Sequence, residues 1–290
     1  MVIKFWGTRG SIPVPGKDTI KYGGNTSCIQ VITDNGENII LDCGTGIRSL
    51  GNYLVRTNHS FEKNLKIFIS HTHWDHIQGL PFFLPFFQKY KIDIYINSKE
   101  SMNLDEVLNA QMHEYFFPVN PDVFSANINF HKLDTSKKMT IDSVDIEMMD
   151  VNHSAGTISF KLSNERGSII YMTDNEILYN AKDEEPTFNR IQELNGKLID
   201  FCKGTDYLIH DSMYLYEDFK NRIGWGHSNN KSLSLFSILA DVKNLIPFHY
   251  EPDYNDDILD KMVDQTKEYL QKENSKIYVM PSYESLEIVI

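Results

Sequence analysis

The stretch "LKIFISHTHWDHIQGL", residues 65–80, places four metal-binding side chains within six positions, directly after an apolar run. In an extended chain His71 and His73 point to the same side, and Asp75 and His76 follow where the chain can turn into a helix. Side-chain packing gives no reason for this density of polar groups, whereas coordination of a metal ion does. The stretch therefore predicts a metal site at the end of a strand.

Further candidate ligands follow later apolar runs. His153 comes after "DIEMMDVN", Asp174 after "SIIYMT" and His249 after "NLIPF". Each lies where a predicted strand meets a loop, which is the usual position of catalytic groups. Taken singly, such a histidine is more often a surface or hydrogen-bonded residue, and such an aspartate is often a helix N-cap. Together with the first four side chains, the three are expected to complete the metal site.

Charge and cysteine content limit the class of protein. The chain has 290 residues, 41% of them apolar, and a formal net charge of -12. An acidic chain without a dense Lys/Arg cluster repels phosphate backbones, which disfavours large nucleic acids as partners. Three widely spaced cysteines form no disulfide framework and suit a reducing cytosol. Because no segment resembles a signal peptide or a membrane span, we expect a soluble cytoplasmic protein with no membrane partner.

The order of predicted elements is β-rich and then helical, twice over. Strands are predicted at 2–6, 26–33, 38–43, 65–70, 93–97, 128–133, 144–151, 157–162, 168–173, 207–210, 245–249, 276–280 and 286–290. Helices are predicted near 46–57, 99–112, 187–202, 229–241 and 256–272. The simplest interpretation is one domain, residues 1–290, with two packed sheets and outer helices. The Phe- and Pro-rich loop 81–90 is either a buried core loop or the wall of a pocket beside the histidines.

The motifs together resemble one known family. "HTHWDH" resembles the HxHxDH signature of the metallo-β-lactamase superfamily, and "VNHSAGT", "MTDNE", "GWGHS" and "PFHYEPD" resemble later motifs of its ribonuclease Z-like and phosphodiesterase branch. The glycine-rich "FWGTRGSIPVPG" and "GGNTSC" resemble the N-terminal loop of that family. The resemblance implies an α/β fold, a four-layer αββα sandwich of two mixed β-sheets with outer helices, and a dinuclear metal site between the sheets.

The same resemblance assigns the ligands of two divalent ions. It implies that the first ion is held by His71, His73 and His153, the second by Asp75, His76 and His249, and that Asp174 bridges both. Imidazole and carboxylate ligands suit zinc best and also admit manganese or iron.

Catalytic helpers are expected around this site. Asp42, in "IILDCGTG", is either a turn residue or a carboxylate that orients a ligand histidine. His227, in "GWGHS", is implied by the resemblance to contact the scissile phosphate, with Ser228 beside it as a further substrate-binding residue. Asp211, in "LIHDS", is expected to hold and charge His227, at a position where ribonuclease members usually carry Glu.

Roles are also expected for an arginine, four further histidines and a tyrosine. Arg9, in "GTRGS", is expected either to contact the substrate phosphate or to serve a structural role. His210 is expected to be buried beside Asp211. Structural roles are expected for His59, His113 and His131. Tyr250 stands where many relatives carry a second histidine, so it is not expected to be a ligand.

These assignments predict a dinuclear metal-dependent phosphodiesterase that hydrolyses a small phosphodiester by attack of metal-bound hydroxide. A cyclic nucleotide or another cyclic phosphate would fit, and Asp75 could accept a proton from the attacking water. The alternatives are a hydrolase of thioesters, lactones or β-lactams, and a ribonuclease Z-like RNA endonuclease. The absence of a long Gly/Pro-rich arm argues against tRNA. His73 argues against the diiron redox relatives, which carry Glu there, and a homodimer is an expectation from the resemblance alone.

Overall fold

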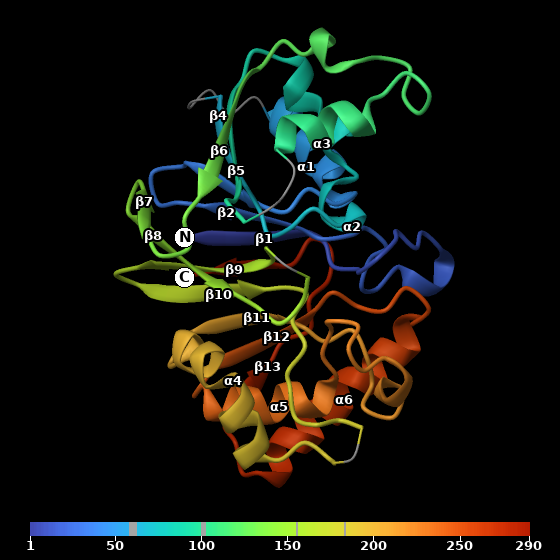
Figure 1. The fold of residues 1–290 in the computed structure, drawn as a ribbon, viewed down its shortest axis with the longest axis vertical. Coiled ribbons are helices and arrows are strands. Elements are labelled where there is room, and N and C mark those ends of the chain that lie inside the picture. Colours follow the sequence, from blue (N-terminus) through green and yellow to red (C-terminus); the bar gives the residue numbers. More distant parts are fainter. Residues whose placement is uncertain (58–62, 100–102, 155, 183) are drawn as a thin grey trace.

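The computed structural model describes residues 1–57, 63–99, 103–154, 156–182 and 184–290. Within these ranges two seven-stranded sheets lie face to face at the centre of the molecule (Figure 1). The first sheet has the strand order β14 (Glu287–Val289), β1 (Val2–Gly7), β2 (Cys28–Ile32), β3 (Asn38–Leu41), β4 (Asn64–Ile69), β5 (Lys91–Asn97) and β6 (Asn127–Leu133). The second has the order β13 (Tyr278–Val279), β12 (Asn244–Phe248), β11 (Tyr207–Asp211), β10 (Gly167–Met172), β9 (Ile158–Asn164), β8 (Val144–Asp150) and β7 (Met139–Ile141).

Both sheets are mixed, and each has one half with parallel strands and one half with antiparallel strands. Strands β3 to β6 run parallel in the first sheet, and β10 to β13 run parallel in the second. Strands β14 to β3 and β7 to β10 pair antiparallel. Helical crossovers between parallel strands place helices on the outer face of each sheet.

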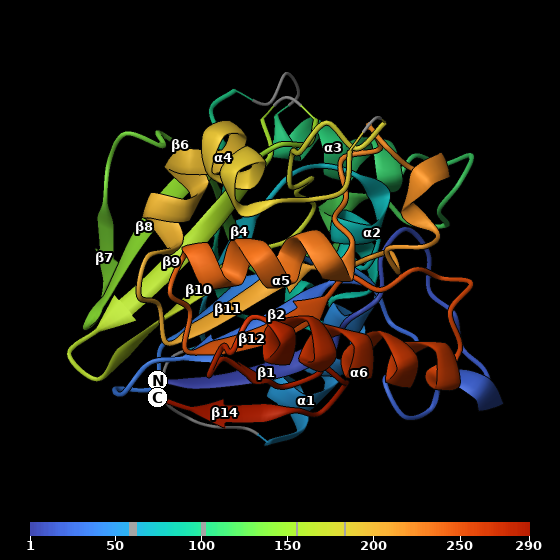
Figure 2. The same cartoon turned by 90° about the horizontal axis from the view of Figure 1, so that it is seen from below.

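Helices cover the two outer faces (Figures 1 and 2). The first sheet is covered by α1 (Gly46–Thr57), α2 (Trp74–Ile77) and α3 (Leu104–Gln111), and the second by α4 (Phe188–Cys202), α5 (Asn230–Leu239) and α6 (Asp256–Lys272). Short 3-10 turns occur at Lys17–Thr19, Leu80–Phe82, Leu84–Phe87, Pro121–Val123 and Phe219–Asn221. The predicted four-layer αββα sandwich is therefore confirmed.

The apolar runs of the sequence are explained by burial on both faces of each sheet. In β4, Phe68 points into the core between the sheets, whereas Ile67 and Ile69 point into the core under α1 to α3. Successive side chains of a strand face opposite sides, so a strand that is covered on both sides reads as a continuous apolar run. The core between the sheets draws residues from both halves of the chain.

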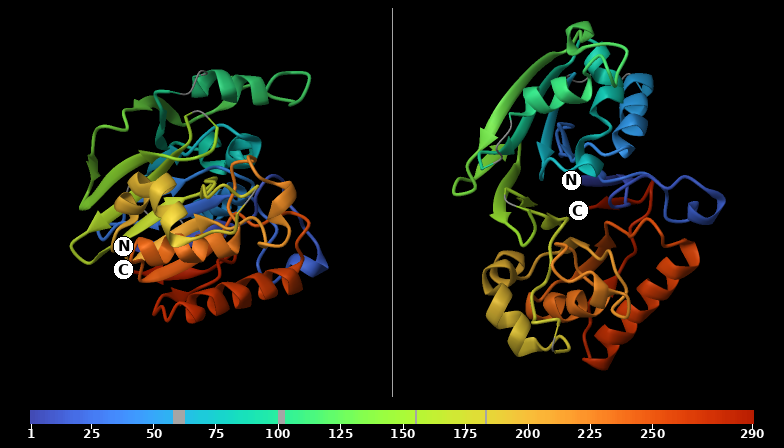
Figure 3. Two further views of the ribbon diagram at one scale, coloured as in Figure 1. Left: turned by 60° about the horizontal axis from the view of Figure 1, so that its bottom comes forward. Right: turned by 45° about the vertical axis from the view of Figure 1, so that its right-hand side comes forward.

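The two ends of the chain lie side by side at the edge of the first sheet (Figure 3). The amino group of Met1 donates to the carbonyl of Ile290 at 2.8 Å, and β1 pairs with β14. In the part of the chain that the structure describes, no helix is both long and apolar enough to cross a membrane.

The element predictions differ from the structure at a few places. Strand β7 was not predicted, because three residues next to "SKK" carry too little apolar periodicity. Helix α3 begins at Leu104 rather than at 99, and residues 100–102 lie outside the described part. In the loop 81–90, Phe83 and Phe86 are buried in the core under α1 to α3, so the loop belongs to the core.

Candidate metal centre

Seven His and Asp side chains meet at one edge of the sandwich, where β4, β8, β10 and β12 end. They are His71, His73, Asp75, His76, His153, Asp174 and His249. Two of the positions have an unusual backbone, with φ of 42° at Asp174 and 59° at His249. A positive φ costs free energy for a residue with a Cβ atom, and here it turns each side chain back toward the cluster directly after its strand.

The first cluster consists of His71, His73, His153 and Asp174, whose ligand atoms lie within 4.8 Å of one another. Nε2 of His153 lies 3.1 Å from Nδ1 of His73. Oδ2 of Asp174 lies 3.6 Å from Nε2 of His71 and 3.6 Å from Nε2 of His153. The four atoms therefore converge on one point, as the predicted first ligand set requires.

The second cluster consists of Asp75, His76, Asp174 and His249, and all four are buried. Nε2 of His76 lies 3.2 Å from Oδ2 of Asp75, 3.1 Å from Oδ1 of Asp174 and 3.3 Å from Nε2 of His249. Nε2 of His249 lies 3.0 Å from Oδ2 of Asp75 and 3.2 Å from Oδ1 of Asp174. The ligand atoms of a four-coordinate zinc ion, with bonds of about 2.0–2.1 Å, lie about 3.3 Å apart, so this spacing fits a small divalent cation.

Asp174 belongs to both clusters. Its Oδ1 faces His76 and His249, and its Oδ2 faces His71 and His153. Burial alone would raise the pKa of Asp174, but His249 and His76 reverse that effect and hold the pKa well below its usual range. The carboxylate is therefore ionised and placed between the clusters, as the predicted bridge requires.

The protonation of the histidines also fits a cation. Burial lowers the pKa of His71 well below its usual value, so this ring is neutral, and its buried Nε2 has no hydrogen-bond partner among the described residues. Burial would likewise lower the pKa of His76, but Asp174, Asp75 and Asp42 raise it well above its usual value. Such a site favours positive charge, which a divalent ion supplies when the rings bind as neutral ligands.

Asp42 orients one of the ligand rings, as predicted. Its Oδ2 accepts from Nδ1 of His76 at 2.7 Å, which directs Nε2 of that ring into the second cluster. The same oxygen accepts from the hydroxyls of Tyr171 at 2.7 Å and Ser70 at 2.8 Å, and Oδ1 accepts from the backbone N–H of Ser70. A carboxylate held by four donors fixes the tautomer and the orientation of the imidazole. Tyr171, from the second sheet, gave no signal in the sequence beyond its place in an apolar strand.

His227 and Asp211 form the expected pair. Nδ1 of His227 lies 2.6 Å from Oδ2 of Asp211, and the pair is almost fully buried. The ring of His227 stacks on His249, with centroids 5.1 Å apart and planes 17° apart, and lies 5.1 Å from His153. Burial lowers the pKa of His227, but the charge of Asp211 and its hydrogen bond raise the pKa to about 9. An imidazolium held in this way is a proton donor facing both clusters.

Arg9 and Ser228 do not contribute their side chains to the site. Arg9 is fully buried and donates to the backbone carbonyls of Gly23, Glu251 and Tyr254. The hydroxyl of Ser228 donates to the carbonyl of Asn175 and accepts from the N–H of Ile177. The prediction that Arg9 and Ser228 bind substrate is wrong, because both side chains are buried and hold loops together. Arg9 has the structural role that was its alternative, although its Nη2 has no partner among the described residues.

The remaining histidines lie away from both clusters or outside the described residues. His210 is buried and bonded to Asn175 and to the carbonyl of Asp211. His131 bonds Asp93 and stacks on Tyr95, and His113 stacks on Tyr115. His59 falls within residues 58–62, outside the part of the chain that the structure describes.

Two cavities border the metal-binding loop, residues 70–79, which carries His71, His73, Asp75 and His76. One, of about 470 Å³, is lined by His73 and His153 of the first cluster and by Asn152, Ser154, Glu176, Leu178, Gly224, Trp225 and Gly226. The other, of about 410 Å³, is mostly apolar and lined by Thr72, Trp74, Ile77, Val107, Ala110, Gln111 and Phe116. Only the first includes ligands of the metal clusters, so it is the candidate substrate cavity. No motif in the sequence had indicated that Glu176 and Trp225 line this cavity.

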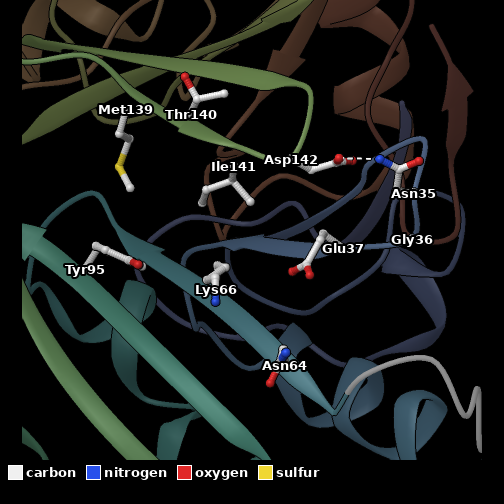
Figure 4. A pocket seen from close by; sticks show the side chains of 10 residues that line it. All are labelled: Asn35, Gly36, Glu37, Asn64, Lys66, Tyr95, Met139, Thr140, Ile141 and Asp142. Atoms are coloured by element: carbon white, nitrogen blue, oxygen red, sulfur yellow. Dashed lines mark hydrogen bonds between the residues drawn. The ribbon is translucent and has the colours of Figure 1, made fainter.

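A third cavity, of about 600 Å³, lies at the opposite edge of the sandwich, where β4 begins (Figure 4). Lys66, Tyr95 and Glu37 come from the first sheet and the turn before β3, and Met139 and Ile141 from β7. Strand β4 begins at this cavity and ends at the metal-binding loop. None of the residues that line the cavity belongs to a metal cluster, so its size does not make it the active site.

The chain is similar to proteins of one superfamily over nearly its whole length. A Ribonuclease Z of Picrophilus torridus is 25% identical over 324 aligned positions, covering 99% of this chain and 98% of that protein. The metallo-β-lactamase fold protein YhfI from Bacillus subtilis has a TM-score of 0.70 at 14% identity, covering 99% of this chain and 98% of that one. Human tRNase Z, short form, has a TM-score of 0.64 at 18% identity, covering 100% of this chain and 99% of that one.

These likenesses confirm the metallo-β-lactamase superfamily and its ribonuclease Z-like branch. A narrower assignment comes from a family model, described as "Anti-Pycsar protein Apyc1", which matches residues 20–202. The matched residues make up more than half of the chain and include His71, His73, Asp75, His76, His153 and Asp174. The chain therefore belongs to the Anti-Pycsar protein Apyc1 family.

Proposed function

We propose that the chain is a dinuclear metal-dependent phosphodiesterase that hydrolyses a small phosphodiester, such as a cyclic nucleotide or another cyclic phosphate. The reaction class, metal-dependent hydrolysis of phosphodiesters, agrees with the Ribonuclease Z and tRNase Z relatives. The substrate, the metals, the roles of the site residues and the action of residues 1–290 as one domain are our proposals.

One observation carries the proposal: a buried, charged proton donor lies against two metal-binding clusters that share one carboxylate. The ring of His227 lies against His249 of the second cluster and His153 of the first. Its Nδ1 is engaged by Asp211, so its Nε2–H is the proton available to a substrate. A site that binds a thioester or a lactone has no need for a second cation beside its metals, whereas a phosphoryl group with two anionic oxygens in the transition state does.

The ligands in the two clusters suit zinc, with manganese or iron as alternatives. Two divalent ions bound there would supply a hydroxide nucleophile at neutral pH and would offset the charge on the phosphoryl oxygens. The chain then has to hold the phosphate in line, accept one proton and donate another. His227 donates its Nε2 proton to the leaving oxygen, and Asp211 stabilises the imidazolium until that step.

Asp75 accepts the proton of the attacking water in this proposal. Its Oδ2 accepts from the backbone N–H of Ser11 at 2.7 Å, and this bond fixes the carboxylate when Nε2 of His249 faces the ion. Burial raises the pKa of Asp75, but His76 and His249 more than reverse this and hold the pKa far below its usual range. The carboxylate is thus ionised. When His76 and His249 bind a metal they do so as neutral rings, so they no longer lower the basicity of Asp75, and the carboxylate can accept a proton.

The size of the substrate is inferred from the cavity and the charge. The cavity beside the first cluster measures about 470 Å³, within the roughly 300–1,000 Å³ range of small-molecule sites. The net charge of -12 opposes a long phosphate backbone. The described ranges contain no extended Gly- and Pro-rich arm like the one that tRNA-processing relatives are expected to carry. A small diester fits these features better than a tRNA precursor.

The test is cleavage of bis(p-nitrophenyl) phosphate by metal-stripped protein that is reloaded separately with zinc, manganese or iron. We expect cleavage to return with at least one metal. His227→Ala should then lower kcat by about 100-fold or more while the bound metal stays at two ions per chain. Exposed Glu193→Gln, on α4, is the matched control. Cleavage of a thioester but of no phosphodiester by fully loaded protein would overturn the proposal.

The ribonuclease alternative is favoured by the Ribonuclease Z relatives and is tested separately. The same loaded protein would be given a tRNA precursor at low and physiological salt. We expect negligible cleavage at physiological salt, because an acidic surface provides few counterion-releasing contacts. Efficient cleavage of the tRNA precursor at physiological salt would contradict the small-substrate proposal and support the ribonuclease alternative.

A further inference from the structure

The cavity beside the first cluster has one wall that the mechanism above does not use. This wall is the turn Gly224–Trp225–Gly226, directly before His227. Its indole is 59% exposed, so a large apolar surface faces solvent at this cavity. The guanidinium of Arg222 lies 5.0 Å from the centre of that ring and holds its orientation. A flat aromatic surface is therefore presented at the mouth of the metal site.

The turn is fixed by a carboxylate on the neighbouring loop. Glu176 is nearly buried, and its Oε2 accepts from the N–H of Gly224 at 2.9 Å and from the N–H of Gly226 at 2.9 Å. Its Oε1 lies 3.0 Å from the same N–H of Gly224. The backbone of Glu176 is in turn bonded to Asn152 through its N–H and its carbonyl. A carboxylate that accepts from two backbone N–H groups holds the turn in one orientation.

The turn also touches the first cluster. The carbonyl of Gly226 accepts from Nδ1 of His153 at 3.0 Å, which directs Nε2 of that ring toward Asp174 and His73. Gly226 has a φ of 84°, and a Cβ atom added there would lie 2.1 Å from Nδ1 of His153. The turn therefore packs against the metal-ligand ring so closely that only glycine fits. Glu176 thus fixes, through one turn, both the indole and the ring.

We propose that this cavity is the subsite for a planar organic group of the substrate, with Trp225 as its stacking surface and Glu176 as the residue that positions the turn. The inference rests on the proposed function, because it assumes a phosphate at the metals. A ligand with its phosphate at the two clusters and a planar ring on the indole matches a nucleotide. Base–aromatic stacking tolerates different bases, because every base has a π-face. The subsite therefore selects for the presence of a base more than for its identity.

The competing location is the apolar cavity that Trp74 and Phe116 line. Its indole is also exposed. The two cavities differ in their relation to the metals, since the Trp225 cavity is lined by two ligand histidines and the Trp74 cavity by none. A compact ligand that keeps its phosphate between the clusters reaches the Trp225 cavity more directly than the Trp74 cavity. Trp74 is therefore the comparison residue in the test.

The experiment measures equilibrium binding, so that it does not depend on turnover. Protein loaded with manganese would be titrated calorimetrically with cytidine 5′-monophosphate and with ribose 5-phosphate, which differ by the base. We expect the nucleotide to bind about tenfold more tightly. Trp225→Ala should remove this difference, Trp225→Phe should keep most of it, and Trp74→Ala should leave it unchanged. Tyr278→Ala, an exposed aromatic on β13 at the opposite end of its sheet, is the matched control.

Several results would overturn the subsite. They are equal binding of the two ligands by unaltered protein, a difference that survives Trp225→Ala, or one that Trp74→Ala removes. Failure of the proposed function is seen separately, as absence of bis(p-nitrophenyl) phosphate cleavage by the same loaded protein. If the protein fails to cleave the diester but still prefers the nucleotide through Trp225, the subsite proposal stands and the phosphodiesterase proposal falls.

The positioning role of Glu176 has its own readout. In Glu176→Gln the side-chain amide turns a donor toward one of the glycine N–H groups, so the turn loosens. We expect loss of the nucleotide preference together with about 10- to 100-fold weaker binding of one of two cobalt ions, followed by the visible absorption of cobalt added to metal-free protein. Gly226→Ala should weaken the binding of the same ion, because the added Cβ atom displaces the ring of His153. Unchanged cobalt binding in both variants, or equal weakening of both ions, would show that Glu176 does not act through this turn.

Discussion

Nδ1 of His227 and Oδ2 of Asp211 lie 2.6 Å apart at the end of β11, and the other oxygen of Asp211 is held by the backbone. Oδ1 accepts from the N–H of Met213 at 3.0 Å and from the N–H of Ser228 at 3.2 Å. The carboxylate cannot rotate away without losing both bonds. A shorter acid than the Glu expected in ribonuclease relatives therefore still reaches the histidine, because the backbone after β11 presents it directly.

Asp211→Asn is expected to lower kcat by about 10- to 100-fold. The amide is nearly isosteric but carries no charge, so it no longer favours the imidazolium of His227, whose pKa of about 9 depends on that charge. Metal content should not change, because Asp211 belongs to neither cluster that surrounds Asp174. Asp206→Asn, at an acid paired with Lys243 on the surface, serves as the control. Full activity of the Asp211 variant would remove the pair from catalysis.

Asp42→Asn is expected to weaken the binding of a metal ion at the second cluster about 10- to 100-fold, because the amide no longer fixes the tautomer of His76. Tyr171→Phe removes only one of the four donors to Asp42 and should cost about 1 kcal/mol of unfolding free energy with little change in metal affinity. Isothermal titration of metal-free protein and urea unfolding give the two quantities. Equal metal affinity in the Asp42 variant and the unaltered protein would contradict the orienting role.

Removal of metal is expected to lower the thermal midpoint. Without ions, the clusters hold imidazoles and carboxylates in a buried space with no cation to offset the carboxylates. Burial lowers the pKa of His71, whereas the neighbouring carboxylates raise the pKa of His76. Binding to the native state alone adds about 2.7 kcal/mol at a free metal concentration one hundred times the Kd. The midpoint should therefore rise with added zinc or manganese in a concentration-dependent way. A midpoint that chelation and reloading leave unchanged would contradict tight binding at these clusters.

The cysteine thiols are expected to be unreactive in the native protein. Cys28, Cys43 and Cys202 are buried and free, and burial raises the pKa of each thiol above its ordinary value. Since the thiolate is the reactive form, a colourless-to-yellow thiol reagent at pH 8 should label none of them until denaturant is added. Rapid labelling of the native protein would show that one of the cores opens readily.

Much of the metal site could be predicted because its ligands follow strand ends. Strongly apolar strands fix where each chain segment stops, and parallel strands bring their carboxyl ends to one edge. His71 and Asp174 could thus be assigned from the sequence, with the family resemblance supplying which ion each serves. An orienting role for Asp42 followed the same logic, since Asp42 also comes directly after a strand, but which histidine it orients, His76, is known only from the structure.

The misassigned and missed residues share a different feature. Glu176 and Ser228 lie in loops where hydrogen bonds to backbone groups decide the role of the side chain. Such bonds depend on the path of a second loop, which local periodicity does not encode. Trp225 could be seen only as one aromatic between two glycines until the loop of Glu176 was placed against it.

Arg9 gives the sharpest test of such a reassignment. Its Nε donates to the carbonyl of Gly23 at 2.9 Å, and its Nη1 donates to the carbonyls of Tyr254 at 2.6 Å and Glu251 at 3.2 Å. Arg9→Met keeps much of the volume but leaves three carbonyls without their donor. Since hydrogen bonds from a charged group contribute about 1.5–3 kcal/mol each, urea unfolding should show a loss of about 3 kcal/mol or more.

The kinetic constants of Arg9→Met should not change at a temperature where the variant stays folded, because a fully buried guanidinium reaches no substrate. Arg9→Lys should recover part of the stability, since an ammonium group can serve one or two of the carbonyls but not all three in a planar fork. A phosphate-binding arginine predicts the reverse pattern, a raised KM at unchanged stability. Measuring KM and unfolding free energy on the same preparations therefore separates the two roles.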